Sequence, residues 1–135
     1  MTLDRIESGR YTVRNQRGGE ITVGSGNTTD FTPVELLLAA LAGCSAIDLD
    51  LIVSKRSVPL EFSAVASGLK VRDELGNRLT DLGVEFRLEF APDASGAEAW
   101  SVVPRSLDQI VSRLCTVSRT VAVGTPVRLR AEGSP

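Results

Sequence analysis

The stretch TPVELLLAALAGCSAIDLDLIVSK, residues 32–55, decides the fold of this chain. Thr32 and Glu35 have the spacing of a capping box, and Pro33 suits the first position of a helix. Every residue in 36–47 is apolar or small, so no side of this helix is suited to water. That run is too short to cross a bilayer, and we therefore expect a buried central helix.

Gly43 and Cys44 lie near the middle of this helix. Glycine costs about 1 kcal/mol relative to alanine inside a helix, which suggests that another backbone or a substrate approaches Gly43 closely. A thiol beside such a position, on the helix expected to be most buried, is the first candidate for chemistry.

The composition is that of a soluble globular protein. The 135 residues are 42% hydrophobic and 24% charged, with a net charge of −2. This length and balance predict one domain, residues 1–135, with a modest core. The basic residues form no block that could hold a phosphate backbone, so nucleic acid is not an expected partner.

The first residues and the cysteines narrow the chemistry. The opening MTLDRIESGR has no apolar run after its charges, so we expect no secretory signal, no membrane association and a reducing, cytoplasmic setting. Two cysteines there are more typical of redox or core thiols than of a structural disulfide. The chain has no histidine, which excludes Ser-His-Asp and Cys-His catalysis and histidine-containing zinc sites. Two thiolates are also too few for a metal site of their own, and we expect neither metal nor bound cofactor.

The rest of the chain shows mostly strand patterns. Residues 91–105 fit only a loop or a frayed helix. Strands are expected in a hairpin at 3–24 with its turn at 15–19, near 58–71, at 84–90 and at 127–132.

A second helix is expected to begin at Ser106. Ser106 and Gln109 repeat the capping-box spacing. The inward stripe of this helix would contain Leu107, Ile110, Val111, Leu114 and Cys115, which follow at helical intervals. The predicted order is ββ-α-ββ-α-β, an α+β domain in which antiparallel sheet covers two helices.

Cys44 and Cys115 are open to two interpretations. A buried cysteine can be simply a small core hydrophobe. Each thiol also lies on the expected buried face of one of two helices, and in a layered fold such faces pack together. The two thiols could then meet as a nucleophile and a resolving partner, which is the geometry of a disulfide cycle.

The segments PVELLLAALAGCSAIDL (33–49) and LCTVSRT (114–120) resemble the OsmC/Ohr family of osmotically inducible and organic hydroperoxide resistance proteins. The resemblance covers roughly residues 32–132 and implies an intertwined α+β homodimer with sites at the subunit interface. It also implies that Cys44 attacks a hydroperoxide and that Cys115 closes a disulfide. The P-x-E-L pattern that begins at position 33 is similar to a sub-branch of OsmC-like proteins.

By the same resemblance, an N-terminal arginine held by a glutamate activates the first cysteine. Glu35 is the matching glutamate, although the capping box explains it equally well. An ideal helix places it roughly 13.5 Å along the axis from Cys44. Arg17 is the leading arginine, with Arg14 and Arg119 as alternatives. A solvated surface charge is the commoner role for an arginine in a hairpin.

Asp48 lies one turn after Cys44, on the same face of the expected helix. A carboxylate there would raise the thiol pKa above about 8.5 unless a cation offsets it. We therefore expect an arginine beside Cys44 if this thiol is to react at neutral pH. Thr116 stands where many relatives have proline, a change that we expect to be tolerated.

These patterns and the resemblance predict an antioxidant thiol peroxidase that reduces organic hydroperoxides, with an external dithiol as reductant. One alternative is a non-enzymatic dimer that binds a small lipophilic ligand. Another is a redox sensor or sulfur carrier that uses the same thiols. Because the central helix is apolar on every side, we also expect an obligate homodimer whose interface includes residues 34–47.

Overall fold

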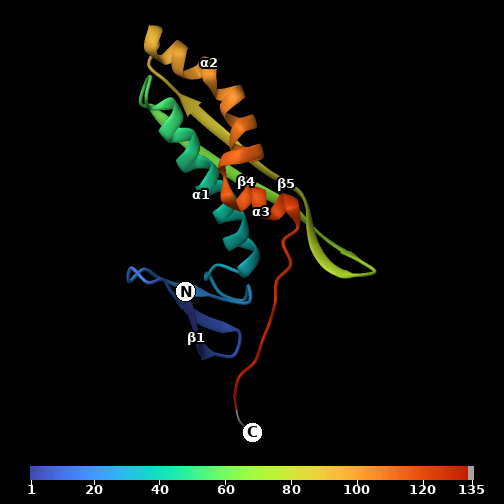
Figure 1. Ribbon diagram of the computed structural model, residues 1–135. Coiled ribbons are helices and arrows are strands. Elements are labelled where there is room, and N and C mark those ends of the chain that lie inside the picture. Colours follow the sequence, from blue (N-terminus) through green and yellow to red (C-terminus); the bar gives the residue numbers. More distant parts are fainter. Residues whose placement is uncertain (134–135) are drawn as a thin grey trace. The chain divides into compact units, whose positions relative to one another are not determined.

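A computed structural model describes residues 1–133 of the protein and shows two compact units (Figure 1). The first unit comprises Met1–Ala42 and Val65–Glu85, and the second comprises Gly43–Ala64 with the chain from Phe86 onward. The expectation of a single domain over residues 1–135 stays a prediction.

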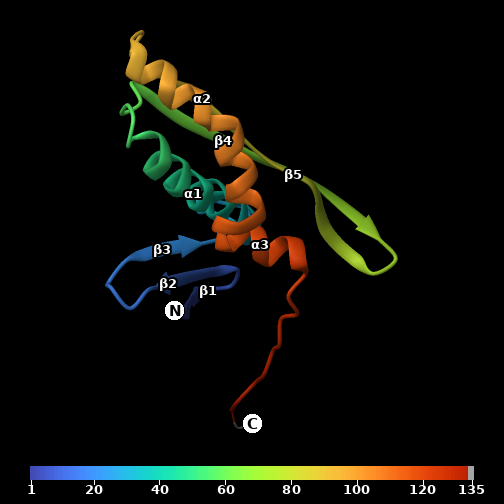
Figure 2. The ribbon, with the colours of Figure 1, turned by 45° about the horizontal axis from the view of Figure 1, so that its top comes forward.

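The first unit contains a three-stranded antiparallel sheet in the order β1-β2-β3, drawn in blue in Figure 2. Its strands are β1 (Thr2–Glu7), β2 (Arg10–Arg14) and β3 (Glu20–Val23). Strands β2 and β3 confirm the predicted hairpin, but β1 was not expected as a separate strand. Its apolar residues Leu3 and Ile6 are three positions apart, and the pairing with β2 is irregular between Arg5 and Glu7. An irregularity of this kind hides the period of two by which a strand is recognised.

Helix α1 (Pro33–Val53) confirms the predicted central helix, and it begins with the predicted capping box. The amide and the hydroxyl of Thr32 donate to Glu35 Oε2 at 2.7 and 2.8 Å, and the Glu35 amide donates to Thr32 Oγ1 at 3.2 Å. The bond from the Thr32 amide, followed by the one from its hydroxyl, holds the pKa of Glu35 below its usual range. Glu35 therefore has the capping role that its position allows.

Helix α1 is not covered on every side by its own chain. Leu49 and Val53 are fully buried, whereas Ile47 and Leu51 are 64% and 62% exposed. The expectation of a helix with no wetted side is therefore wrong for the chain taken alone. The 21-residue helix is also longer than the apolar run at 36–47, and by length and composition it could cross a membrane.

Gly43 lies in open space. A Cβ atom placed on it would have no heavy atom within 4 Å, its own helix backbone and chain neighbours aside. Residues 1–133 thus supply no close neighbour of the kind expected from the sequence.

Strands β4 (Glu61–Asp73) and β5 (Gly76–Glu89) form a two-stranded sheet and confirm the strands expected near 58–71 and at 84–90. Both strands run through the two units. Strand β5 begins earlier than predicted, because only two residues separate it from β4. Asp81, which has a positive φ of 50°, breaks the alternation in its first half.

Helix α2 (Ala94–Gln109) occupies the segment that the sequence left as a loop or frayed helix. Asp93 caps it, with Oδ1 accepting from the Gly96 amide at 2.9 Å. The predicted capping box at Ser106 is wrong. Ser106 is buried within the helix, and its hydroxyl donates to the Val102 carbonyl at 2.8 Å. Pro104 resembles a helix boundary in the sequence, yet the helix continues through it.

A π-helical turn, η1 (Ile110–Leu114), joins α2 to α3 (Thr116–Val123). The Cys115 amide donates to the Ile110 carbonyl, five residues back, at 2.9 Å. The extra residue in this turn changes the register of the predicted stripe. Ile110 and Cys115 are buried as expected, whereas Val111 and Leu114 are 60% and 50% exposed.

Residues 127–132 do not form the predicted last strand. Val127 and Leu129 are 85% and 91% exposed, so the alternating apolar residues contact no core. Alternation indicates a strand only where a neighbouring strand is available, and no strand within residues 1–133 pairs with this segment.

In the core of the second unit, the C-terminal half of α1 packs with α2 and η1. These elements lie over the adjoining parts of β4 and β5 (Figure 1). Phe62 of β4 and Phe86 of β5 contribute an edge-to-face pair with ring centroids 5.8 Å apart. The buried cluster consists of Leu49, Val53, Ala99, Val103, Ile110 and Cys115. The predicted α+β class with antiparallel sheet is thus confirmed, with α3 as an additional short helix.

Candidate functional site

The two cysteines meet inside the second unit. Cys44 lies on α1 and is partly buried, and Cys115 lies at the start of α3 and is fully buried. Both are free thiols, Cys44 packs against the buried cluster that contains Cys115, and each thiol shifts the pKa of the other. The fold therefore brings together two thiols that are 71 positions apart in the sequence.

The Cys115 sulfur accepts hydrogen bonds from two serines. The Ser118 hydroxyl lies 3.2 Å from Sγ, the Ser118 amide 3.4 Å and the Ser45 hydroxyl 3.6 Å. Cys115 is also the N-cap residue of α3, where the amides of the first helical turn gather. Several donors and a helix N-terminus around one sulfur form a site that favours a thiolate.

Neither serine was predicted as a site residue from the sequence. The signal available for Ser118 was the three-residue spacing from Cys115, which is the spacing of an N-cap side chain and the amide that it accepts. Ser45 had no such signal, because it bonds to a residue 70 positions away.

The surroundings of the two thiols shift their pKa values in opposite directions. Burial opposes ionisation of Cys115, but hydrogen bonds from Cys44, Ser118 and Ser45 outweigh it and lower the pKa of Cys115 to about 7. The interaction with Cys115 is the main cause that raises the pKa of Cys44. The amides of Val117 and Thr116 act on Cys44 in the opposite direction. The hydrogen bonds to the Cys115 sulfur therefore favour the ionised form of this thiol.

The lowered pKa of Cys115 predicts how the free energy of unfolding depends on pH. Because the pKa of Cys115 is about 7 in the folded protein and 9.0 for a free thiol, ionisation of this group favours the folded state. The contribution is complete above pH 9.0 and is lost as the pH falls through about 7. Between these values we expect the free energy of unfolding of the reduced protein to rise by up to about 2 kcal/mol more than that of Cys115→Ser. Urea unfolding at several pH values measures the difference, and parallel pH profiles of the two proteins would contradict it.

Asp48 does not contribute to the pKa of Cys44 within the described chain. Its Oδ2 atom is buried and accepts no hydrogen bond from residues 1–133. The amides of Val117 and Thr116, at the start of α3, favour the ionised form of Cys44. An arginine beside Cys44 stays a prediction.

The expected partners of Cys44 in the N-terminal region lie in the first unit. Arg14 pairs with Asp4 and Glu20 at 2.9 and 2.8 Å on the surface of the sheet. Arg17 is exposed in the turn between β2 and β3, where its amide donates to Asn15 Oδ1 at 2.8 Å. The activation of Cys44 by Arg17 and Glu35 stays a prediction.

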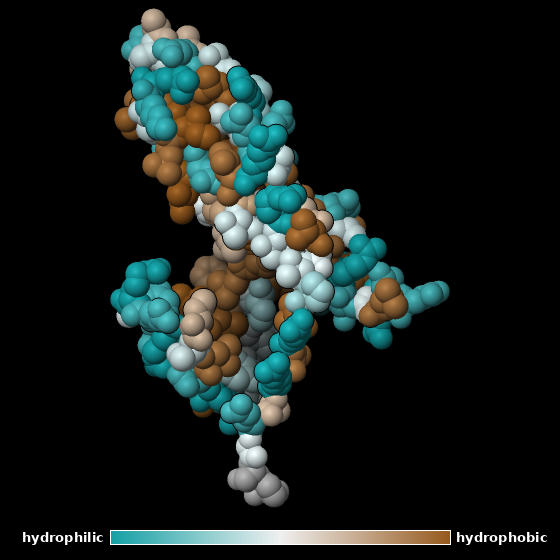
Figure 3. Space-filling view, viewed as in Figure 1, coloured by the Kyte–Doolittle hydropathy of each residue, from teal (hydrophilic) through white to brown (hydrophobic). Residues whose placement is uncertain are grey.

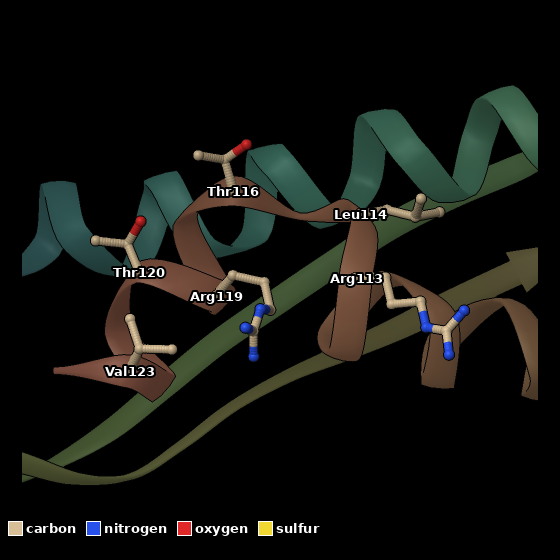
Figure 4. Close-up of a pocket in the computed structure, with 6 residues that line it drawn as sticks. All are labelled: Arg113, Leu114, Thr116, Arg119, Thr120 and Val123. Carbon is tan, nitrogen blue, oxygen red and sulfur yellow. The ribbon is translucent and has the colours of Figure 1, made fainter. Parts of the chain in front are cut away.

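Arg119, the third candidate arginine, lines an open pocket of about 320 Å³ around η1 and α3. In Figure 4 the guanidinium groups of Arg113 and Arg119 extend to the same side of this segment. Neither arginine forms an ion pair within residues 1–133. The pocket is lined by Arg113, Leu114, Thr116, Arg119, Thr120 and Val123. These residues flank Cys115 in the sequence, so the pocket adjoins the thiol segment and carries positive charge.

A larger pocket in the second unit has a different character. Its volume is about 590 Å³, and it lies between the end of β5 and the start of α2. Its walls include Phe90 and Trp100, whose rings are in edge contact with centroids 6.5 Å apart. Within residues 1–133, no three His, Cys, Asp or Glu side chains gather as they would around a metal ion.

Comparison with known proteins extends over nearly the whole chain. Residues 24–130 match the family described as OsmC-like protein. Uncharacterized proteins of Mycobacterium bovis and Mycobacterium tuberculosis are each 33% identical over 130 residues, which cover 94% of this chain and 91% of each relative.

Solved structures show the same fold at low sequence identity. A hypothetical protein from Aquifex aeolicus is 18% identical with a TM-score of 0.71, over 92% of this chain and 86% of that one. An OsmC-like protein from Mycoplasma pneumoniae is 16% identical with a TM-score of 0.67, over 90% of this chain and 84% of that one. The solved structures show the fold alone. The family match over residues 24–130 and the mycobacterial relatives show that the chain belongs to the OsmC-like protein family.

Proposed function

We propose that the protein is a thiol-dependent peroxidase that reduces organic hydroperoxides with Cys44 and Cys115. The observation that carries the proposal is the meeting of the two thiols in the second unit, where Cys44 packs against the buried cluster that contains Cys115. Membership of the OsmC-like family supports the same chemistry, because the family includes peroxidase-like members.

In the proposed cycle, the Cys44 sulfur attacks the distal oxygen of the hydroperoxide. The O–O bond breaks, the alcohol leaves and Cys44 becomes a sulfenic acid. The Cys115 sulfur then displaces water from Cys44 and forms the disulfide. An external dithiol reduces this disulfide by exchange, which needs a reducing compartment, and we propose a cytoplasmic setting for that reason.

The two cysteines differ in access, and this difference supports the proposed roles. Cys115 has no exposed surface, whereas Cys44 is only partly buried. Cys115 packs in the apolar cluster with Leu49 and Ile110. Apolar surroundings favour an alkyl hydroperoxide over hydrogen peroxide as the substrate.

The proposal is tested by adding an organic hydroperoxide such as cumene hydroperoxide to the reduced protein. We expect both thiols to disappear and peptide mass spectrometry to find a Cys44–Cys115 disulfide within one chain. A dithiol reductant should then sustain turnover. If both thiols survive an excess of hydroperoxide, the peroxidase function is wrong.

A second function, binding of a lipophilic ligand, is favoured by the pocket of about 590 Å³ beside Trp100. Trp100 is the single tryptophan of the chain, so its fluorescence reports on this pocket alone. A saturable fluorescence change with a fatty acid, in a protein whose thiols resist peroxide, would favour the binding function over the enzyme.

We further propose that the protein is a homodimer, as the OsmC-like family generally is. Ile47 and Leu51 leave most of their apolar surface exposed on α1. Figure 3 shows hydrophobic side chains at the surface of the second unit as well. A second copy that covers this face of α1 would remove that surface from water.

Replacing Ile47 with lysine is therefore expected to shift the protein from dimer to monomer, because burial of an unpaired ammonium in an apolar interface is costly. Sedimentation velocity at micromolar concentration measures the shift. The matched control is Leu75→Lys at the fully exposed tip between β4 and β5, which should stay dimeric. A wild-type protein that sediments as a folded monomer would contradict the homodimer.

A further inference from the structure

We propose that the pocket between the end of β5 and the start of α2 binds a small organic cation, an alkylated ammonium ion. The rings of Phe90 and Trp100 receive its alkyl groups, and the carboxylates of Glu89 and Asp93 offset its charge. The proposal names a ligand class for the second function given above, ligand binding in this pocket, and it rests on that function rather than on the peroxidase.

One face of α2 forms the floor of the pocket, where β5 leads into the helix (Figure 1). Asp93, Gly96, Ala97 and Trp100 line it, and their spacing of three, four and seven residues from Asp93 places them on the same face. Because Gly96 and Ala97 have almost no side chain, the floor stays low between the carboxylate and the indole. The result is a concavity of about 590 Å³, which is a usual volume for a small-molecule site.

Phe90 and Trp100 form two adjoining walls. Their ring centroids are 6.5 Å apart and their planes meet at 65°. Phe90 packs against the buried cluster of the second unit, which fixes its ring, and Trp100 keeps 56% of its surface exposed. A cation in the angle between two such rings contacts both, and aromatic sites of this kind recognise quaternary ammonium ions.

The charged residues of the pocket are both acidic. Glu89 and Asp93 line it, and among the residues that the structure describes no Lys or Arg does. Neither carboxylate forms an ion pair within residues 1–133. The hydrogen bond from the Gly96 amide, followed by the one from Ser95, holds the pKa of Asp93 below its usual range, so this carboxylate is ionised at neutral pH. The pocket therefore attracts a cation and repels the head group of a fatty acid.

A metal ion does not fit these walls as an alkylated ammonium does. A hard cation needs about six oxygen ligands, and no group of three His, Cys, Asp or Glu gathers anywhere in residues 1–133. An alkylated ammonium carries apolar surface of its own, which the two rings remove from water. Both the rings and the carboxylates are then used by one ligand.

The proposal is tested on the full-length protein by the fluorescence of Trp100, the single tryptophan of the chain. The probe is choline, and its neutral match is dimethylbutanol, in which a carbon atom replaces the nitrogen. Dimethylbutanoate is the corresponding anion. At equal and low ionic strength, we expect a saturable change with choline, about tenfold weaker binding of the alcohol and weaker binding still of the carboxylate.

The acidic residues are tested by removing one charge at a time. Glu89→Gln and Asp93→Asn should each weaken choline binding by about threefold and leave the alcohol unaffected. Asparagine at position 93 can still cap α2, so the helix start is kept. Glu98→Gln is the matched control, because Glu98 is an exposed carboxylate of α2 that does not line the pocket. It should leave choline binding unchanged.

The contribution of the indole is measured by calorimetry, because the fluorescence is lost with Trp100. Trp100→Leu keeps an apolar wall but removes the π face, so choline should lose affinity while the alcohol does not. Trp100→Phe restores a ring and should recover most of the choline binding. Because Phe is also the more conservative change, this variant tests the ring even where Trp100→Leu fails to fold.

The outcomes separate the ligand class from the binding function. If choline and the alcohol bind equally, or if only the carboxylate binds, the ammonium class is overturned and ligand binding in the pocket stands. If none of the three probes binds and a fatty acid also fails, both are overturned. Retention on phosphatidylcholine vesicles without binding of free choline would overturn a soluble ligand.

Discussion

Cys44→Ser is expected to lower the rate of organic hydroperoxide reduction by roughly a thousandfold or more. A serine hydroxyl is a far weaker nucleophile than a thiolate, and the amides of Thr116 and Val117 cannot bring its pKa near neutrality. The remaining thiol, Cys115, has no exposed surface through which a peroxide could reach it. Peroxide consumption in the presence of a dithiol reductant measures the loss.

Cys115→Ser is the informative partner of that variant. It leaves Cys44 in place but removes the sulfur that closes the disulfide. We expect one oxidation per chain and then an arrest as the Cys44 sulfenic acid, which dimedone traps for mass spectrometry. Full turnover in Cys44→Ser, or a disulfide-dependent cycle in Cys115→Ser, would contradict the assigned roles.

Gly96→Ala is expected to destabilise the protein by about 3 kcal/mol. Gly96 is buried in the first turn of α2, and a Cβ atom there would overlap the Ala91 carbonyl oxygen and lie 3.1 Å from Phe90 Cβ. A backbone oxygen cannot rotate away as a side chain can, so the start of α2 has to shift. The Asp93 cap, which bonds the Gly96 amide, would be strained by the same shift.

Urea unfolding of Gly96→Ala measures this loss, with Gly133→Ala as the control. Gly133 has no heavy atom within 4 Å of an added Cβ and no positive φ, so the same change there should cost almost nothing. A loss below about 1 kcal/mol in Gly96→Ala would mean that the turn before α2 adapts to the methyl group.

Local signals were enough to predict the elements whose ends are fixed by neighbouring residues. The capping box of Thr32 and Glu35 closes within four residues, and the bonds that it predicts are present. The strand at 84–90 likewise depends on simple alternation along one segment. The family resemblance rested on residues around Cys44 and Cys115, which the fold brings into contact.

The features that were not predicted from the sequence have a different physical origin from those that were. Helix α2 continues through Pro104, because packing of Ala99 and Val103 in the core compensates for the lost backbone hydrogen bond. The alternation at 127–132 lacks a strand to pair with. Ser45 could not be assigned, because its role depends on where a sulfur 70 positions away lies, whereas the spacing of Ser118 from Cys115 was a local signal.

The turn η1 lets the chain lose one residue here without turning a thiol away from its partner. A π-helical turn contains one residue more than the α-helical path between the same ends. Deleting Ser112 would therefore let a regular α-helical turn join Ile110 to Cys115. Cys115 would still face Cys44 and Ser45. Relatives can therefore be sorted by counting: a chain with one residue fewer in this turn is expected to keep a working pair of cysteines on an uninterrupted helix.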